Sequence, residues 1–239
     1  MIGNYSTAMN FAVLITFFST PIAAVLFPAF SKLNPQKEKE TLRNVFQFSV
    51  KYAALLVVPA AALIALSKPI VFTLFGGKYA HAPLFLALIA ISYIYPAFGS
   101  LSLGNLINSQ GKTKVTLKLT LITATIGFPL SLPLIPKLGI IGLIITTLTA
   151  GTPSLTISLR YVKKHFTLTI SWASSAKILL ASTLAAIITY AITSQLSLAN
   201  WTKLIIGATL FLTTYTTTAP LTGAKNKTDI QKLREMPKE

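Results

Sequence analysis

Cysteine is absent from this 239-residue sequence, and acidic residues are nearly so, with five Asp and Glu in total. The lack of cysteine excludes disulfides, cysteine-ligated metals and thiol catalysis. The five acidic residues all lie outside the long apolar segments: Glu38, Glu40, Asp229, Glu235 and Glu239. Intramembrane carboxylates are the usual proton relays and cation ligands. The sequence therefore argues against the membrane enzymes that depend on such carboxylates.

Charged residues of both signs are also scarce. They make up 11% of the chain, whereas an ordinary soluble domain carries about 25%. Hydrophobic residues make up 53%, and the mean hydropathy is +0.67. A composition this apolar excludes a disordered chain and leaves too little polar surface to cover a water-soluble core. It predicts an integral membrane protein.

Seven apolar stretches are long enough to cross a hydrocarbon core about 30 Å thick, which takes roughly 20 helical residues. None of them shows the period-two alternation of a barrel strand. They are approximately Ala8–Phe30, Val45–Leu66, Pro83–Leu106, Val115–Leu134, Gly139–Leu159, Ala176–Ser194 and Leu204–Pro220. The sequence thus predicts an all-α, polytopic membrane bundle of about seven transmembrane helices over residues 1–220. A basic cytoplasmic tail is predicted over 221–239.

The N-terminal segment does not have the pattern of a secretory signal. No basic residue precedes its apolar run, and that run is too long for a signal-peptide core. We therefore expect it to form the first membrane helix.

The 21 Lys and Arg residues give the chain a net charge of +16. Because each span reverses the side of the membrane, 17 of these residues sort to one side and 4 to the other. The smaller set is Lys68, Lys78, Lys137 and Lys203. Basic residues collect in cytoplasmic loops, so we expect a multi-pass protein of the cell membrane with its N-terminus outside and its tail in the cytoplasm. The same rule accounts for the charge without a nucleic-acid partner.

Several short motifs fail the tests for a catalytic or metal site. The two histidines, His81 and His165, fall on opposite predicted sides and cannot share a metal ion. The string Gly111-Lys112-Thr113 resembles the end of a phosphate-binding loop, but Leu106 stands where that motif requires glycine. No Gly-x-Ser-x-Gly is present. We therefore expect no catalytic residue, no metal, no cofactor and no enzymatic activity.

Two lysines lie a few residues inside predicted spans, at the cytoplasmic end. Lys51 and Lys118 either extend toward the lipid headgroups or form a cationic rim that attracts an anionic headgroup such as a pyrophosphate. Lysine binds phosphate as a point charge, so both residues are candidate substrate contacts. Two aromatic residues within a span, Tyr93 and Tyr95, either line a cavity or only pack.

Five strings carry a family resemblance by their order and spacing. They are Gly3–Ala8, Leu26–Leu33, Leu74–Tyr79, Gln110–Thr113 and Leu134–Gly142. Together they resemble the C-terminal part of polysaccharide-transport flippases, which belong to the multidrug, oligosaccharidyl-lipid and polysaccharide exporter superfamily. The match covers roughly residues 1–165, and the last two helices match only in hydropathy.

The resemblance implies a transporter of two inward-facing helical bundles that moves lipid-linked oligosaccharides to the outer leaflet by alternating access. Its members typically have twelve to fourteen helices, and the first helix here looks like the eighth of the family, which implies the same orientation as the charge distribution. Two features of the family are missing. Val115–Leu134 has none of the Asn residues often found in its counterpart, and the neighbourhood of Ala150-Gly151 lacks a Glu. The resemblance therefore supports the fold of the family more strongly than its coupling mechanism.

The predicted function is half of a membrane flippase for lipid-linked oligosaccharides or polysaccharide precursors. The alternatives are a multidrug exporter of the same superfamily, a non-transporting membrane interaction protein, and a truncated remnant. Membrane lipids and a lipid-linked saccharide are the expected partners. Because the cavity of such transporters forms between two bundles, we also expect a second helical bundle, either an N-terminal half or another copy.

Overall fold

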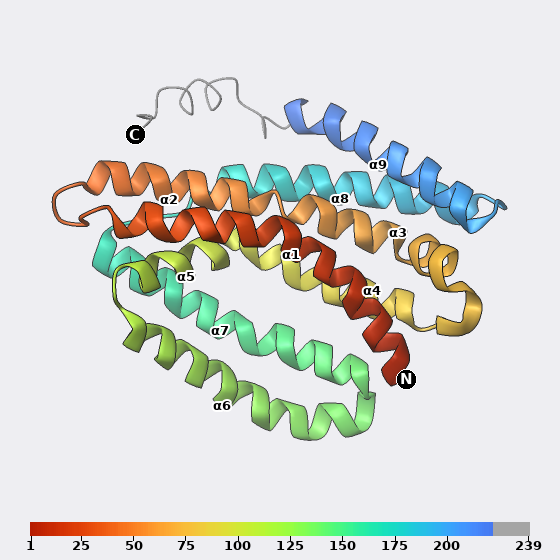
Figure 1. Cartoon of the computed structure of the whole chain (residues 1–239), viewed down its shortest axis with the longest axis horizontal. Helices are drawn as coiled ribbons and strands as arrows, with labels where there is room; N and C mark the ends of the chain where they lie inside the picture. Colours follow the sequence, from red (N-terminus) through yellow and green to blue (C-terminus); the bar gives the residue numbers. More distant parts are fainter. Residues whose placement is uncertain (222–239) are drawn as a thin grey trace.

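The computed structural model describes residues 1–221, which are helical almost throughout and contain no strand (Figure 1). The elements are α1 (Ile2–Ser31), α2 (Lys39–Ala54), α3 (Val57–Phe75), η1 (Gly76–Tyr79), α4 (Ala82–Ala90), η2 (Ile91–Phe98), α5 (Ser100–Ser109), α6 (Thr113–Leu138), α7 (Ile140–Phe166), α8 (Trp172–Gln195) and α9 (Asn200–Leu221). The labels η1 and η2 denote 3₁₀ helices. Apart from Leu221, which ends α9, the tail predicted over 221–239 lies outside the described residues.

The fold class is confirmed as an all-α membrane bundle. Five segments of the described chain are single spans by length and apolarity: α1, the α2–α3 run, α6, α7 and α8. The α4–η2 segment and α5 together make a sixth, bent by 55°. Helix α9 occupies the seventh predicted stretch but is not among these spans. Each of the seven predicted stretches thus corresponds to one helix or to two or three consecutive helices.

The second span is divided by a proline. Pro59 has no N–H, so the carbonyl of Leu55 loses its usual helical partner. That carbonyl instead accepts a bond from the N–H of Val58, at an N–O distance of 3.0 Å. The tightened turn separates α2 from α3 without ending the span, which continues from Lys39 to Tyr79.

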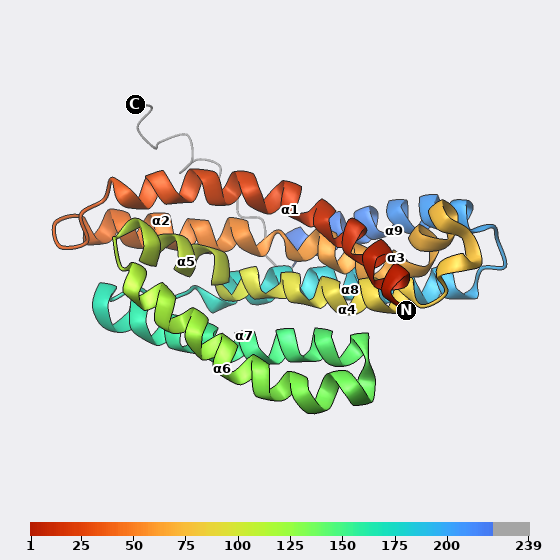
Figure 2. The same ribbon diagram turned by 60° about the horizontal axis from the view of Figure 1, so that its bottom comes forward.

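Successive spans run in opposite directions, so the connections gather at the two ends of the bundle (Figures 1 and 2). The α1–α2, α5–α6 and α7–α8 connections lie at one end, which is the left end in Figure 1. The other end holds the N-terminus and the α3–α4, α6–α7 and α8–α9 connections. Lys78 of η1 and Lys137 in the last turn of α6 belong to this second end. The structure therefore groups the connections as the charge argument requires, while the choice of the cytoplasmic end stays a prediction.

Small polar residues are buried along α8, which packs mainly against α3 and α9. Ser175, Ser182 and Thr189 recur every seven residues and are buried. On α9, a Cβ added to Gly207 would overlap the side chain of Leu66 on α3. Membrane helices approach closely through such small residues, because lipid tails provide little hydrophobic drive for association. Helices α3, α8 and α9 therefore form one closely packed layer.

Helices α6 and α7 form a hairpin along one side of this layered bundle (Figure 2). Within α6, Leu119 is the single buried residue of the 26. Most of the surface of α6 is therefore left uncovered by the described part of the chain.

Candidate functional site

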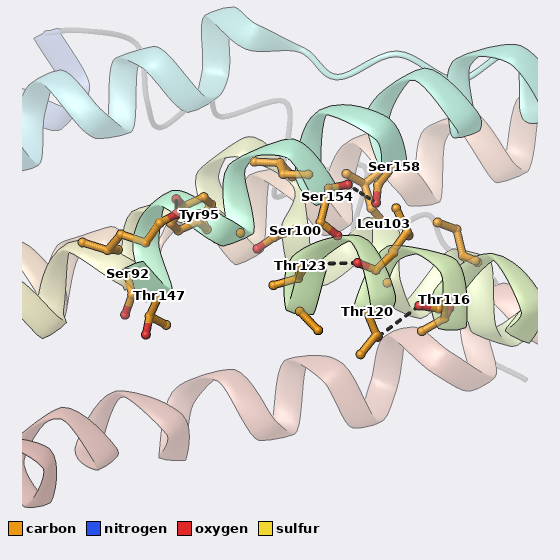
Figure 3. Close-up of a pocket in the computed structure, with 17 residues that line it drawn as sticks. Ser92, Tyr95, Ser100, Leu103, Thr116, Thr120, Thr123, Thr147, Ser154 and Ser158 are labelled. Atoms are coloured by element: carbon orange, nitrogen blue, oxygen red, sulfur yellow. Dashed lines mark hydrogen bonds between the residues drawn. The ribbon is translucent and has the colours of Figure 1, made fainter. Parts of the chain in front are cut away.

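A cleft of about 640 Å³ lies between the bent α4–η2–α5 segment and the α6–α7 hairpin (Figure 3). Of the 17 lining residues, nine carry a hydroxyl group, and none of these described residues is charged. The hydroxyl-bearing residues are Ser92, Tyr95, Ser100, Thr116, Thr120, Thr123, Thr147, Ser154 and Ser158. We refer to this feature as the hydroxyl cleft.

A break in the third span opens the hydroxyl cleft. Pro96 cannot donate a backbone hydrogen bond, and the surrounding residues wind as a 3₁₀ helix, which often marks a hinge when it interrupts a longer helix. Gly99 then adopts a left-handed conformation with φ of +84°, which a residue with a side chain rarely takes. The resulting bend turns α5 away from the line of α4 and leaves room beside the hairpin.

Two glycines keep this room free. Gly104 of α5 and Gly151 of α7 line the cleft, and a Cβ added to either would meet no atom within 4 Å. The cleft at these positions is therefore bounded by backbone, and its width depends on the absence of two side chains.

The threonine and serine hydroxyls of the cleft donate mostly to carbonyls of their own helices. Thr120 donates to the carbonyl of Thr116 at 3.1 Å, and Thr123 to that of Leu119 at 3.0 Å. Ser158 makes the equivalent bond to the carbonyl of Ser154 at 2.8 Å (Figure 3). A hydroxyl that has donated its proton still accepts through its lone pairs. The cleft therefore presents uncharged acceptor oxygens, which suit a ligand rich in hydroxyl donors.

Tyr95 links the two sides of the cleft. Its hydroxyl donates to the backbone carbonyl of Leu148 on α7 and lies 3.0 Å from the hydroxyl oxygen of Thr152. The sequence left open whether Tyr93 and Tyr95 line a cavity or only pack. Tyr95 lines the cleft. Tyr93 packs instead against an apolar cluster that contains Ile15.

The spacing of hydroxyl residues in the sequence is a signal for this site. Thr116, Thr120 and Thr123 are spaced by four and three residues, which places them on one helix face. Thr147, Ser154 and Ser158 are spaced by seven and four residues on the next long helix. Two hydroxyl-bearing faces on consecutive spans indicate a shared polar lining. They do not indicate which other helix lies opposite that lining.

The two lysines predicted to contact substrate lie outside the lining of the hydroxyl cleft. Lys51 is half-buried on α2, and Lys118 is exposed on α6, one residue before the lining residue Leu119. The structure does not bring either of them into the cleft, and their role stays a prediction. Among residues 1–221, no group of three or more metal-binding side chains is found.

The amino-acid sequence is similar to one family model and to two proteins of archaea. Residues 1–83 match a family model described as a polysaccharide biosynthesis protein. An uncharacterized membrane protein of Methanocaldococcus jannaschii is 29% identical over 143 residues, which are 59% of this chain and 28% of the relative. A probable low-salt glycan biosynthesis flippase of Haloferax volcanii is 21% identical over 217 residues, which are 90% of this chain and 46% of the relative.

The fold has a counterpart among solved structures. The lipid II flippase MurJ in its inward closed conformation superposes with a TM-score of 0.75 at 18% identity, over 92% of this chain and 46% of that one. The matched region thus spans less than half the length of each of these three proteins. The Haloferax alignment of 217 residues extends beyond residue 165, so the motif-based limit of the resemblance was too short. In sequence and in fold, the chain is therefore similar to flippases of polysaccharide and glycan biosynthesis, the family that its motifs resemble.

Proposed function

We propose that this chain forms part of a membrane flippase that carries lipid-linked saccharides across the bilayer by alternating access, without a chemical step. The observation that carries the proposal is the hydroxyl cleft, an uncharged and hydroxyl-lined space within a bundle that has the fold of a lipid II flippase. The relative from Haloferax volcanii, itself described as a probable glycan flippase, supports the same class of cargo.

The chemistry of the cleft favours a saccharide over a cationic drug. Saccharide hydroxyls donate to neutral oxygens, and the cleft offers such oxygens from Thr120, Thr123 and Ser158 after their own protons are used. A lipophilic cation is stabilised in a membrane by an acidic partner, and no described residue of the cleft is acidic. The lining therefore supports the flippase over the multidrug exporter.

The exposed hairpin supports a partner for this chain within the membrane. Transporter cavities form between two helical bundles near the membrane midplane. Helix α6 is the least buried of the long helices, and one of its faces carries Thr116, Thr120 and Thr123. Polar groups facing lipid are costly, so we propose that a second helical bundle covers this side, either an N-terminal half or another copy.

Lys51 and Lys118 are proposed to attract the anionic headgroup of the substrate at the cytoplasmic end of the bundle. Replacing Lys51 and Lys118 with Gln is expected to slow flipping of a lipid-linked oligosaccharide in vesicles that also hold the second bundle. Each basic residue near an anionic headgroup contributes about 1 kcal/mol, so the rate is expected to fall by roughly fivefold for each lysine removed. The matched control is K37Q/K39Q, which removes the same charge at the α1–α2 connection and the first residue of α2.

Two outcomes would count against these ideas. An unchanged rate in K51Q/K118Q would favour lysines that merely extend to the headgroups. No flipping in vesicles that hold both bundles of the native protein would contradict the flippase itself.

The proposed orientation places the end with the α1–α2 connection in the cytoplasm. Because the native chain has no cysteine, a single introduced cysteine is a unique label. K37C is expected to react with a membrane-impermeant thiol reagent only from the cytoplasmic side, and N226C from that same side. K137C is expected to react only from outside, because an odd number of spans separates it from Lys37. Labelling of K37C and N226C from opposite sides would contradict this topology.

A further inference from the structure

A second, smaller pocket lies where α7 passes into α8, at the end of the bundle with the α1–α2 connection. Its volume is about 240 Å³. The wall is apolar and includes Phe46, Leu103 and Val162, each about 1% exposed. The side chains of Arg160, Lys163 and Trp172 also line it. We refer to this feature as the corner pocket.

The corner pocket is built by a connection that is anchored to the bundle. Helix α7 ends at Phe166, and Thr167 follows it with a left-handed φ of 56° that turns the chain. In the irregular segment that follows, Leu168 and Ile170 are buried. Ile170 packs against Gly99, where an added Cβ would come within 2.7 Å of its side chain. The α7–α8 connection, which forms this wall, is therefore packed against the core of the bundle.

The charges at the pocket have no counter-ion in the described chain. Arg160 and Lys163 are three residues apart, which places them on the same face of α7. Neither forms an ion pair with any residue between 1 and 221, and no carboxylate lines the pocket. Two cations beside one apolar pocket leave an anionic binding position open.

Trp172 indicates that the corner pocket lies at the membrane surface. Trp172 begins α8 and is 51% exposed. Tryptophan is enriched at the boundary between the hydrocarbon and the headgroups, where its ring is apolar and its N–H is hydrated. Lys163 lies in the last turn of α7, and Arg160 lies one turn before it. The cationic side of the pocket therefore belongs to the headgroup region, and its apolar wall to the region below.

We propose that the corner pocket binds an anionic phospholipid. The phosphate contacts Arg160 and Lys163, and the adjoining part of an acyl chain packs on the wall of Phe46, Leu103 and Val162. The planar guanidinium of Arg160 forms two parallel bonds to one phosphate, and the Lys163 ammonium adds a point charge. The corner pocket adjoins the hydroxyl cleft, because Leu103 lines both, but it shares none of the hydroxyl-bearing residues of the cleft. The test of this proposal therefore measures lipid binding and not transport.

Tryptophan fluorescence provides the test, because the chain has only two tryptophans. In a W201F background, Trp172 is the single reporter. The protein is reconstituted in phosphatidylcholine vesicles with increasing fractions of phosphatidylglycerol that carries brominated acyl chains. We expect stronger quenching at equal fraction than with brominated phosphatidylcholine. The double variant R160Q/K163Q is expected to raise the fraction needed for half-maximal quenching by about fivefold for each cation removed.

The neighbouring Lys164 is the matched control, since it lies in the same turn but does not line the pocket. K164Q is expected to retain the preference for phosphatidylglycerol, and R160K is expected to retain part of it. Equal quenching by the two brominated lipids would overturn the proposal. An equal loss in K164Q and K163Q would also overturn it by pointing to diffuse surface charge. Displacement by millimolar inorganic phosphate would instead assign a free-phosphate site.

Discussion

Replacing Gly104 and Gly151 together with leucine is expected to slow saccharide transport without unfolding the protein. Both glycines line the hydroxyl cleft, and a Cβ at either position meets no atom within 4 Å. The two leucine side chains would extend into the cleft and occupy the space of a ligand. Because filling an occupied space with extra side-chain atoms costs about 1–3 kcal/mol for each site, and 1.4 kcal/mol corresponds to tenfold, we expect flipping in vesicles to fall at least about tenfold.

The stability of this double variant is expected to remain the same or to rise. Glycine within a helix is less favourable than leucine by up to about 1 kcal/mol, and no atom opposes the new side chains. The midpoint of thermal unfolding in detergent measures the stability of the double variant. Gly77 of η1 is the matched control, because a Cβ there also meets nothing within 4 Å but lies outside the cleft. Normal transport by G104L/G151L would exclude the cleft from the transport path, and a lower Tm would contradict the free space at these glycines.

Replacing Gly142 with valine is expected to disrupt the α6–α7 hairpin. A Cβ at Gly142 would overlap the backbone carbonyl of Leu134 in the last turns of α6. Backbone atoms of a helix cannot rotate away as a side-chain end can, so relief requires a shift of the hairpin. The turn between the helices depends on Gly139, with a φ of 59°. We expect a loss of about 3 kcal/mol, at the upper end for overpacked sites, read as a lower midpoint of unfolding.

Alanine separates this steric explanation from a general effect of losing a glycine. G142A is expected to be destabilised almost as much as G142V, because the Cβ itself makes the overlap. G151A, on the same helix, is expected to be neutral or slightly stabilised, since its Cβ enters open space. Equal unfolding midpoints for G142A and G151A would show that the hairpin does not require the close approach at Gly142.

The transmembrane helices and the family resemblance could be predicted from the sequence alone. Whether a segment spans a bilayer depends on its length and on satisfying its own backbone hydrogen bonds, which are local properties. Ala8–Phe30 and Val115–Leu134 therefore correspond to α1 and α6, with ends that differ by at most six residues. The order of spans also determines which connections share an end, so the grouping of the basic residues followed from the same local pattern.

The two binding features depended on the tertiary structure. The hydroxyl cleft forms because the bend at Gly99 carries α5 away from α4 and toward a hairpin that begins at Thr113. Periodicity identified one face of α6 as rich in threonine but not the surface opposite it. The corner pocket likewise requires Ile170 to meet Gly99, which is 71 residues away in the chain. Contacts between helices distant in sequence are set by packing, bends and close approaches at glycine, and the hydropathy of either partner alone does not specify them.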